Sequence, residues 1–144
     1  MPISIIAHVA TPVVNPRAAR SHRLLLAALA GEFADAPLYA DISALAAPIK
    51  ARYLSRLARW PELHAKLLFG SDFPVPPGVW ALRGALGSAY RAVAAERSWP
   101  QKAARAARAL GYNEIVFRRA AELLPNVDFF HAGRHGQGPR ESGA

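Results

Sequence analysis

The sequence predicts an α/β fold in which short parallel β-strands alternate with helices. Three apolar segments have the composition of strands, and they cover residues 3–8, 38–43 and 66–70. Their starts are spaced by about one βαβ unit, which takes ~30 or more residues. Parallel strands joined by right-handed crossovers end at the same edge of the sheet, so we expect the three carboxyl ends to share one rim.

Two helical segments with clear start and stop signals separate these strands. Asn15 is suited to the N-cap and Pro16 to the first position of a helix that ends at Gly31. Pro48 opens a second helix, and Pro61 ends it near residue 60 because a proline disfavours helix in the residue before it. The pattern strand, helix, strand, helix, strand is therefore complete by residue 70.

The chain becomes helical after the third strand. We expect helices over residues 78–97, 100–110 and 113–124, the first weakened by its two glycines, the second closed by Gly111 and the third capped by Asn113.

The domain organisation predicted from these elements is one folded unit over residues 1–125, followed by a disordered tail over 126–144. Residues 132–144 have almost no apolar side chains and could bury little surface. Three parallel strands make a poor sheet alone, because such sheets depend on neighbouring strands and covering helices. We therefore expect the chain to be the C-terminal part of a larger α/β protein, with an open sheet edge suited to homo-oligomers or to pairing with another chain.

Composition narrows the classes of function. The chain has no cysteine, which excludes disulfides, thiolate metal sites and a cysteine nucleophile. Its longest apolar run, residues 24–30, is far shorter than the ~20 residues of a membrane span, and no signal peptide is recognisable, so a cytoplasmic protein is expected. The net charge is +8, but the arginines and lysines are scattered along helical faces without a nucleic-acid motif. This pattern favours solvated helix faces over a nucleic-acid interface, and no membrane partner is expected.

Polar side chains stand at the ends of all three expected strands. They are His8 at the first, Asp41 and Ser43 at the second, and Asp72 at the third, in the turn Gly-Ser-Asp-Phe-Pro-Val-Pro. By the period of two, His8 would share a strand face with Ser4. His8 and Asp72 suit the activation of water on a metal, because an aspartate can accept the proton of the water and a histidine can polarise a carbonyl.

Residues 7–11, 39–45 and 67–76 resemble the last three strands of the amidohydrolase superfamily, in particular its amidohydrolase-related branch of (β/α)8-barrel hydrolases and decarboxylases. The resemblance implies a partial (β/α)8 barrel and a metal-dependent hydrolase that acts on C–N or C–O bonds or on carboxylated small molecules. It implies that Asp72 binds a divalent metal, zinc in the first instance, and shuttles a proton. His8 would contact the substrate or the metal-bound water, and Asp41 and Ser43 would support the site or the substrate.

The sequence departs from the family pattern in three respects. The His-x-His metal pair of the first barrel strand and the ligand from the middle strands are absent, Ala10 stands where many members have glycine, and Arg119 stands where asparagine is frequent. We therefore expect weak zinc binding, or none, and little hydrolysis from this chain alone.

Other interpretations remain open. The chain could be a non-catalytic basic module that binds nucleic acid or an acidic partner, or a remnant without activity. His8 could be a hydrogen-bonded structural residue, and Asp72 could cap its own turn. The other four histidines lack partners at ligand spacing and are expected at the surface: His22, His64, His131 and His135.

Overall fold

The computed structural model describes residues 2–12 and 18–124, and it confirms a mixed α/β fold with a small parallel sheet. The strands are β1 (Ser4–Ile6), β2 (Leu38–Asp41) and β3 (Leu67–Leu68), in the spatial order β1-β2-β3. Both neighbouring pairs are parallel. The predicted strands are correct in place and direction, but each is shorter than expected.

The two crossover helices are α1 (Ala18–Ala30) and α2 (Ala51–Leu57). Helix α1 ends directly before Gly31, as predicted, whereas its expected cap at residues 15–16 lies outside the described residues. Helix α2 is shorter than expected because residues 44–50 form successive turns before it begins. A 3₁₀ segment, η2 (Pro61–Lys66), then leads into β3.

The helix expected over residues 78–97 is wrong as a single element. The structure divides it into η3 (Val79–Leu82), α3 (Arg83–Leu86), η4 (Gly87–Ala89) and α4 (Tyr90–Ala95). The main break is at Gly87, which has a φ of 52° and a ψ of −124° and so cannot continue a helix.

The last two helices agree better with the sequence. Helix α5 (Trp99–Leu110) begins slightly earlier than expected, because the Ser98 side chain caps it, and it ends at Gly111 in the left-handed conformation. Helix α6 (Glu114–Leu123) begins after Asn113, but the Asn113 side chain makes no capping hydrogen bond among the described residues. The predicted side-chain cap is therefore wrong, although the helix boundary is right. The expected tail, residues 126–144, lies outside the described residues.

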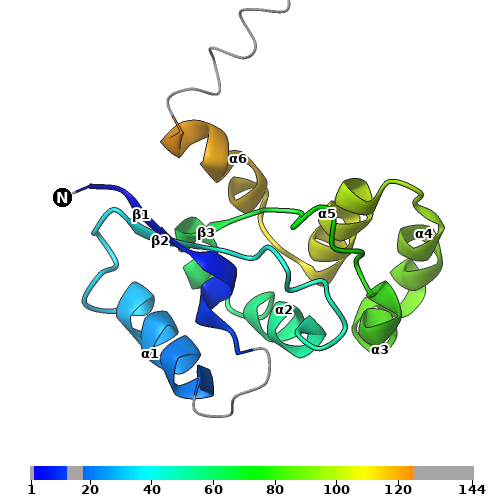
Figure 1. The fold of residues 1–144 in the computed structure, drawn as a ribbon, viewed down its shortest axis with the longest axis horizontal. Helices are drawn as coiled ribbons and strands as arrows, with labels where there is room; N and C mark the ends of the chain where they lie inside the picture. Colours follow the sequence, from blue (N-terminus) through cyan, green and yellow to red (C-terminus); the bar gives the residue numbers. More distant parts are fainter. Residues whose placement is uncertain (1, 13–17, 125–144) are drawn as a thin grey trace, which may run out of the picture.

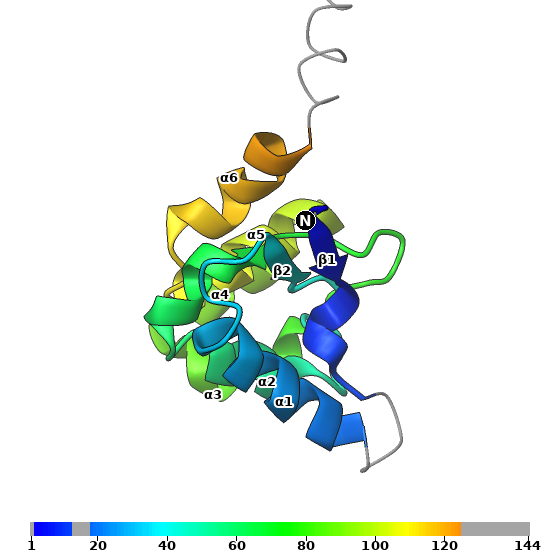
Figure 2. The same cartoon turned by 90° about the vertical axis from the view of Figure 1, so that its left-hand side faces the viewer.

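Helices cover the sheet unevenly. In Figures 1 and 2, α1 and α2 lie on one side of the sheet and α6 lies on the other, while α3, α4 and α5 form a separate group. The first residue after β3, Phe69, donates its backbone N–H to Val116 O of α6 at 2.8 Å, and its ring lies 5.2 Å from that of Phe117. Helix α6 thus covers the end of β3, whereas no strand in the described part of the chain pairs with the outer edge of β1.

The core fills the space between the sheet and its helices, and two histidines that were expected at the surface are buried. His64 is fully buried and His22 is 7% exposed, so the expectation of surface histidines is wrong for both. His131 and His135 lie outside the described residues. The largest fully buried apolar side chains are Leu29, Leu45, Leu54, Leu57, Leu63, Leu67 and Leu82.

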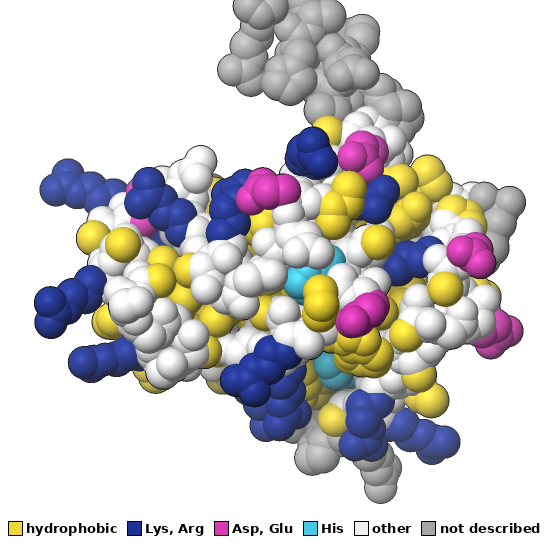
Figure 3. All heavy atoms as spheres, turned by 180° about the vertical axis from the view of Figure 1, so that it is seen from behind, with side chains coloured by type: hydrophobic (Ala, Val, Ile, Leu, Met, Phe, Trp, Pro, Cys, Tyr) yellow, Lys and Arg dark blue, Asp and Glu magenta, His cyan; other side chains and the backbone are white. Residues whose placement is uncertain are grey.

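The basic side chains are not concentrated on the face of the molecule seen in Figure 3. Figure 3 shows the Lys and Arg side chains of one face distributed widely rather than gathered in one patch. Within the described ranges, no helix has both the length and the apolar character needed to cross a membrane.

Candidate functional site

The turn that follows β1 has an unusual backbone. Residues Ala7–Ala10 form a 3₁₀ segment, η1, in which His8, Val9 and Ala10 have φ values of 54°, 51° and 51°. Such left-handed conformations are costly for residues with a Cβ atom. His8 therefore does not continue the strand, and the expectation that it shares a strand face with Ser4 is wrong.

Three hydrogen bonds hold this turn in place. The backbone N–H and the hydroxyl of Thr11 both donate to His8 O, at 2.9 and 2.8 Å. From α1, the Nδ1 atom of His22 lies 2.7 Å from Val9 O. A carbonyl oxygen only accepts, so His22 Nδ1 carries the hydrogen. Burial lowers the pKa of His22 and so disfavours the charged form of its ring.

His8, Asp41 and Ser43 form a hydrogen-bonded cluster at the carboxyl ends of β1 and β2. Asp41 Oδ1 accepts from the backbone N–H of His8 at 3.1 Å, from the backbone N–H of Ser43 at 2.9 Å, and from the Ser43 hydroxyl. His8 Nδ1 lies 2.8 Å from Ser43 Oγ, 3.1 Å from Ser43 O and 3.5 Å from Asp41 Oδ1. The structure therefore joins three of the four residues singled out in the sequence.

These contacts assign the hydrogen on the His8 ring. Ser43 O and the Asp41 carboxylate only accept, and the Ser43 hydroxyl already donates to Asp41, so Nδ1 must be the donor. The other ring nitrogen, Nε2, makes no hydrogen bond with any residue that the structure describes. The His8 side chain is 36% exposed, so Nε2 is available to solvent or to a ligand. The cluster thus orients the imidazole and leaves one nitrogen for chemistry.

Asp72 lies in the turn that follows β3, at the same end of the sheet as this cluster. Its φ is 57°, a conformation that aspartate tolerates better than most residues. The turn is closed by other groups: Asp72 O accepts the backbone N–H of Val75 at 2.8 Å, and Ser71 Oγ accepts that of Phe73 at 3.3 Å. Within the described ranges the Asp72 carboxylate makes no hydrogen bond, so it neither caps its turn nor joins the cluster.

Two glycines pack the loop after β3 against the loop after β2. A Cβ atom on Gly70 would lie 2.9 Å from Ser43 Cβ, and one on Gly78 would lie 2.2 Å from Pro48 Cγ. Gly78 also donates its backbone N–H to Ala46 O at 2.9 Å. The segment that carries Asp72 is therefore held at both ends against the loop that carries Ser43.

The buried His64 has a structural explanation. Its Nε2 lies 3.2 Å from Leu57 O, its Nδ1 accepts the backbone N–H of Asn113 at 3.2 Å, and its ring stacks on Tyr112 at 4.9 Å. Both ring nitrogens are thus occupied in joining α2 to the start of α6. The His64 partners Leu57 and Asn113 lie 7 and 49 residues away along the chain, so spacing between candidate ligands did not reveal its burial.

The described residues do not complete a metal centre. Nowhere in residues 2–12 and 18–124 do three histidine, aspartate or glutamate side chains come together as a metal site would require. His8 and Asp72 could contribute two contacts at most, and Oδ1 of Asp41 is occupied by its three donors. Zinc sites use three or four ligands, so these residues alone do not fit a tightly held ion.

No family model, no curated protein and no solved structure matches this chain. Function therefore has to be inferred from the geometry of the site itself.

Proposed function

We propose that this chain carries part of the active site of a hydrolase of the amidohydrolase type, within a partial (β/α)8 barrel, that acts on a small amide, ester or carboxylated compound. The observation that supports it most is the oriented imidazole of His8, with Nδ1 bonded to Ser43 and Nε2 available. A histidine that donates one ring nitrogen to the protein while presenting the other is the usual arrangement for metal-ligating and catalytic histidines.

In this proposal His8 and Asp72 have different roles. Asp72 is the base that accepts a proton from the attacking water, since its carboxylate has no hydrogen-bond partner in the described residues. The His8 ring already donates through Nδ1, so it donates from Nε2 only as the imidazolium; in that form its hydrogen bond to the carbonyl oxygen under attack stabilises the negative charge that develops there. Asp41 and Ser43 are positioning residues, because they act through the His8 ring and backbone.

The resemblance to amidohydrolases assigns Asp72 a divalent metal, zinc in the first instance. Such an ion would lower the pKa of bound water. Because the described residues do not complete a metal centre, further ligands would have to come from outside these residues.

A zinc titration followed by histidine-selective NMR of the full chain tests whether His8 and Asp72 serve one site. We expect weak binding that shifts the Nε2 resonance of His8, and we expect Asp72→Asn to reduce that shift strongly. Asp35→Asn, which removes an exposed carboxylate between α1 and β2, is the matched control and should have no effect. Zinc that moves only other histidines, or moves His8 equally in Asp72→Asn, would contradict a shared site. A stoichiometric zinc ion that survives dialysis would contradict the incomplete centre.

A further inference from the structure

A second cavity lies between α1 and α2, away from the His8 cluster. It has a volume of about 250 Å³ and is lined by His22, Arg23 and Leu26 of α1, by Arg56 and Leu57 of α2, and by Trp60. Ligand sites for drug-sized molecules usually measure ~300–1,000 Å³, so this one suits a smaller molecule. None of the four residues of the proposed hydrolase site lines it.

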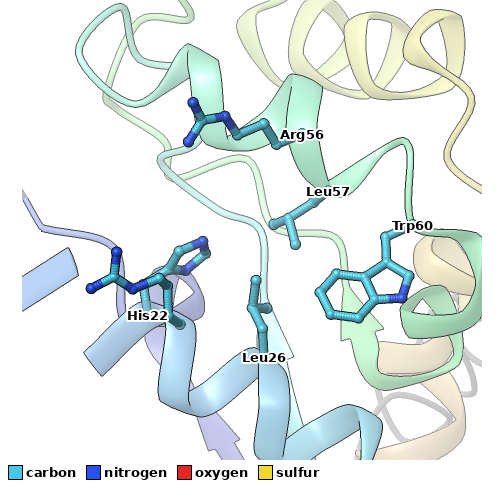
Figure 4. Close-up of a pocket in the computed structure, with 6 residues that line it drawn as sticks. His22, Leu26, Arg56, Leu57 and Trp60 are labelled. Atoms are coloured by element: carbon cyan, nitrogen blue, oxygen red, sulfur yellow. The ribbon is translucent and has the colours of Figure 1, made fainter. Parts of the chain in front are cut away.

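The cavity has an apolar end and a cationic end. In Figure 4, Leu26 and Leu57 point toward one another across the gap between the helices, with Trp60 on one side of them and His22 and Arg56 on the other. Trp60 is 39% exposed, so its indole forms an accessible wall rather than part of the core. A ligand with an apolar group and a charged group at opposite ends would match this division.

The cationic end has no carboxylate to neutralise it within the described residues. Neither Arg23 nor Arg56 forms an ion pair among residues 2–12 and 18–124, although four other ion pairs occur there. Both arginines are exposed, so their guanidinium groups can move toward a ligand. The neighbouring His22 already donates Nδ1 to Val9 O, so the ring is fixed at the wall of the cavity.

The position on the helices favours one negative charge over two. Arg56 and Leu57 are the last two residues of α2, the end at which a helix dipole is negative, although their carbonyls accept hydrogen bonds from the backbone N–H groups of Arg59 and Trp60. A planar carboxylate matches the fork of an arginine guanidinium in a bidentate pair. A phosphate dianion would bring a second charge to the unfavourable end of the helix.

We propose that the cavity between α1 and α2 binds a small carboxylate carried on an apolar group, with the carboxylate at Arg23 and Arg56 and the apolar group between Leu26, Leu57 and Trp60. The expected ligand is a short aryl- or alkyl-carboxylate.

Isothermal titration of the full chain with 3-phenylpropanoate tests this proposal. We expect one site, with acetate and the neutral 3-phenylpropan-1-ol binding at least about tenfold more weakly, because each lacks one of the two matched groups. Arg56→Gln and Arg23→Gln should each weaken binding by roughly three- to tenfold, given that the arginines are exposed. Arg59→Gln removes the same charge from the same region without lining the cavity, so it should leave binding unchanged.

A second measurement does not depend on the stability of any variant. Nuclear Overhauser effects between the phenyl protons of 3-phenylpropanoate and the Trp60 indole should appear in the unmodified protein. No such effects should appear at Trp80 or Trp99. Contacts at those two tryptophans instead of Trp60 would overturn the location.

Four results would overturn the chemistry. Equal binding of the acid and the alcohol would leave only an apolar groove, and equal weakening by Arg59→Gln would indicate a diffuse positive field. Tighter binding of phenyl phosphate than of 3-phenylpropanoate would replace the carboxylate with a phosphate. We expect a dissociation constant of ~1 mM for 3-phenylpropanoate. The absence of any heat of binding at about 10 mM of this probe would therefore exclude the proposed carboxylate site.

Discussion

Replacing Gly70 with alanine tests the packing that holds the His8 cluster. The new methyl carbon would lie 2.9 Å from Ser43 Cβ, whereas unstrained carbon atoms approach to ~3.5–4.0 Å. The overlap is thus roughly 0.6–1.1 Å. Ser43 cannot turn its Cβ away without moving its backbone, which is held by the hydrogen bond from its N–H to Asp41.

The expected cost follows from two opposing effects. Forcing an extra methyl group into a packed site typically costs ~1–3 kcal/mol. Alanine also restricts the unfolded chain relative to glycine, which returns about 0.4–1 kcal/mol. We therefore expect Gly70→Ala to lower the free energy of unfolding by about 1–2 kcal/mol. Displacement of Ser43 should also lengthen or break its hydrogen bond with His8 Nδ1.

Equilibrium unfolding in urea measures the first effect, and the ¹⁵N resonance of His8 Nδ1 measures the second. Gly84→Ala is the matched control, because a Cβ atom there meets no described atom within 4 Å and lies in α3. Alanine should stabilise that helix by up to about 1 kcal/mol. If Gly70→Ala were as stable as the unmodified chain and left the His8 resonance in place, the close packing of Gly70 on Ser43 would be refuted.

Two further predictions concern the turn after β1 and the histidine that holds it. Ala10→Gly should raise the free energy of unfolding by about 0.5–1 kcal/mol, because the ~1–2 kcal/mol cost of a left-handed alanine exceeds the extra freedom of an unfolded glycine. Ala27→Gly, in the middle of α1, is the control and should lose stability in urea unfolding. A similar loss of stability for Ala10→Gly would contradict the left-handed backbone at Ala10. Burial lowers the pKa of His22 below its ordinary 6.5, so below about pH 6.5 the unfolded chain binds more protons than the folded one and stability falls as the pH falls. The urea midpoint should therefore drop from pH 7 to 5, and His22→Gln should reduce that drop; an equal drop in both proteins would assign the effect to other groups.

The parallel sheet was predictable because its determinants are local. Apolar runs with polar ends, and helix signals such as Gly31 and Gly111, specify the order of elements, and that order requires crossovers between parallel strands. The same reasoning brought His8, Asp41 and Ser43 to one rim. Their direct hydrogen bonds were not predictable, because they depend on three non-glycine residues that adopt left-handed conformations.

The burial of two histidines was missed for a related reason. A histidine can be buried when groups elsewhere in the chain pair with its ring nitrogens, as Val9 O does for Nδ1 of His22 and as Leu57 and Asn113 do for both nitrogens of His64. Spacing along the chain shows candidate metal ligands but does not show such partners. The breaks in the 78–97 segment were only partly readable, since Gly87 interrupts the helix but Gly84 does not.

The contacts of Gly70 and Gly78 have a consequence for how Asp72 can move. Because both glycines rest on one neighbouring loop, the stretch between them resembles a handle attached at two points to the same support. These contacts oppose sliding of the whole stretch past Ser43, and a third contact lies at its tip, where the Phe73 ring is 6.2 Å from that of Trp99. The tip residue Phe73 is exposed. A molecule that binds the Phe73 ring would therefore move the neighbouring Asp72 relative to the His8 imidazole while the contacts of Gly70 and Gly78 stay in place.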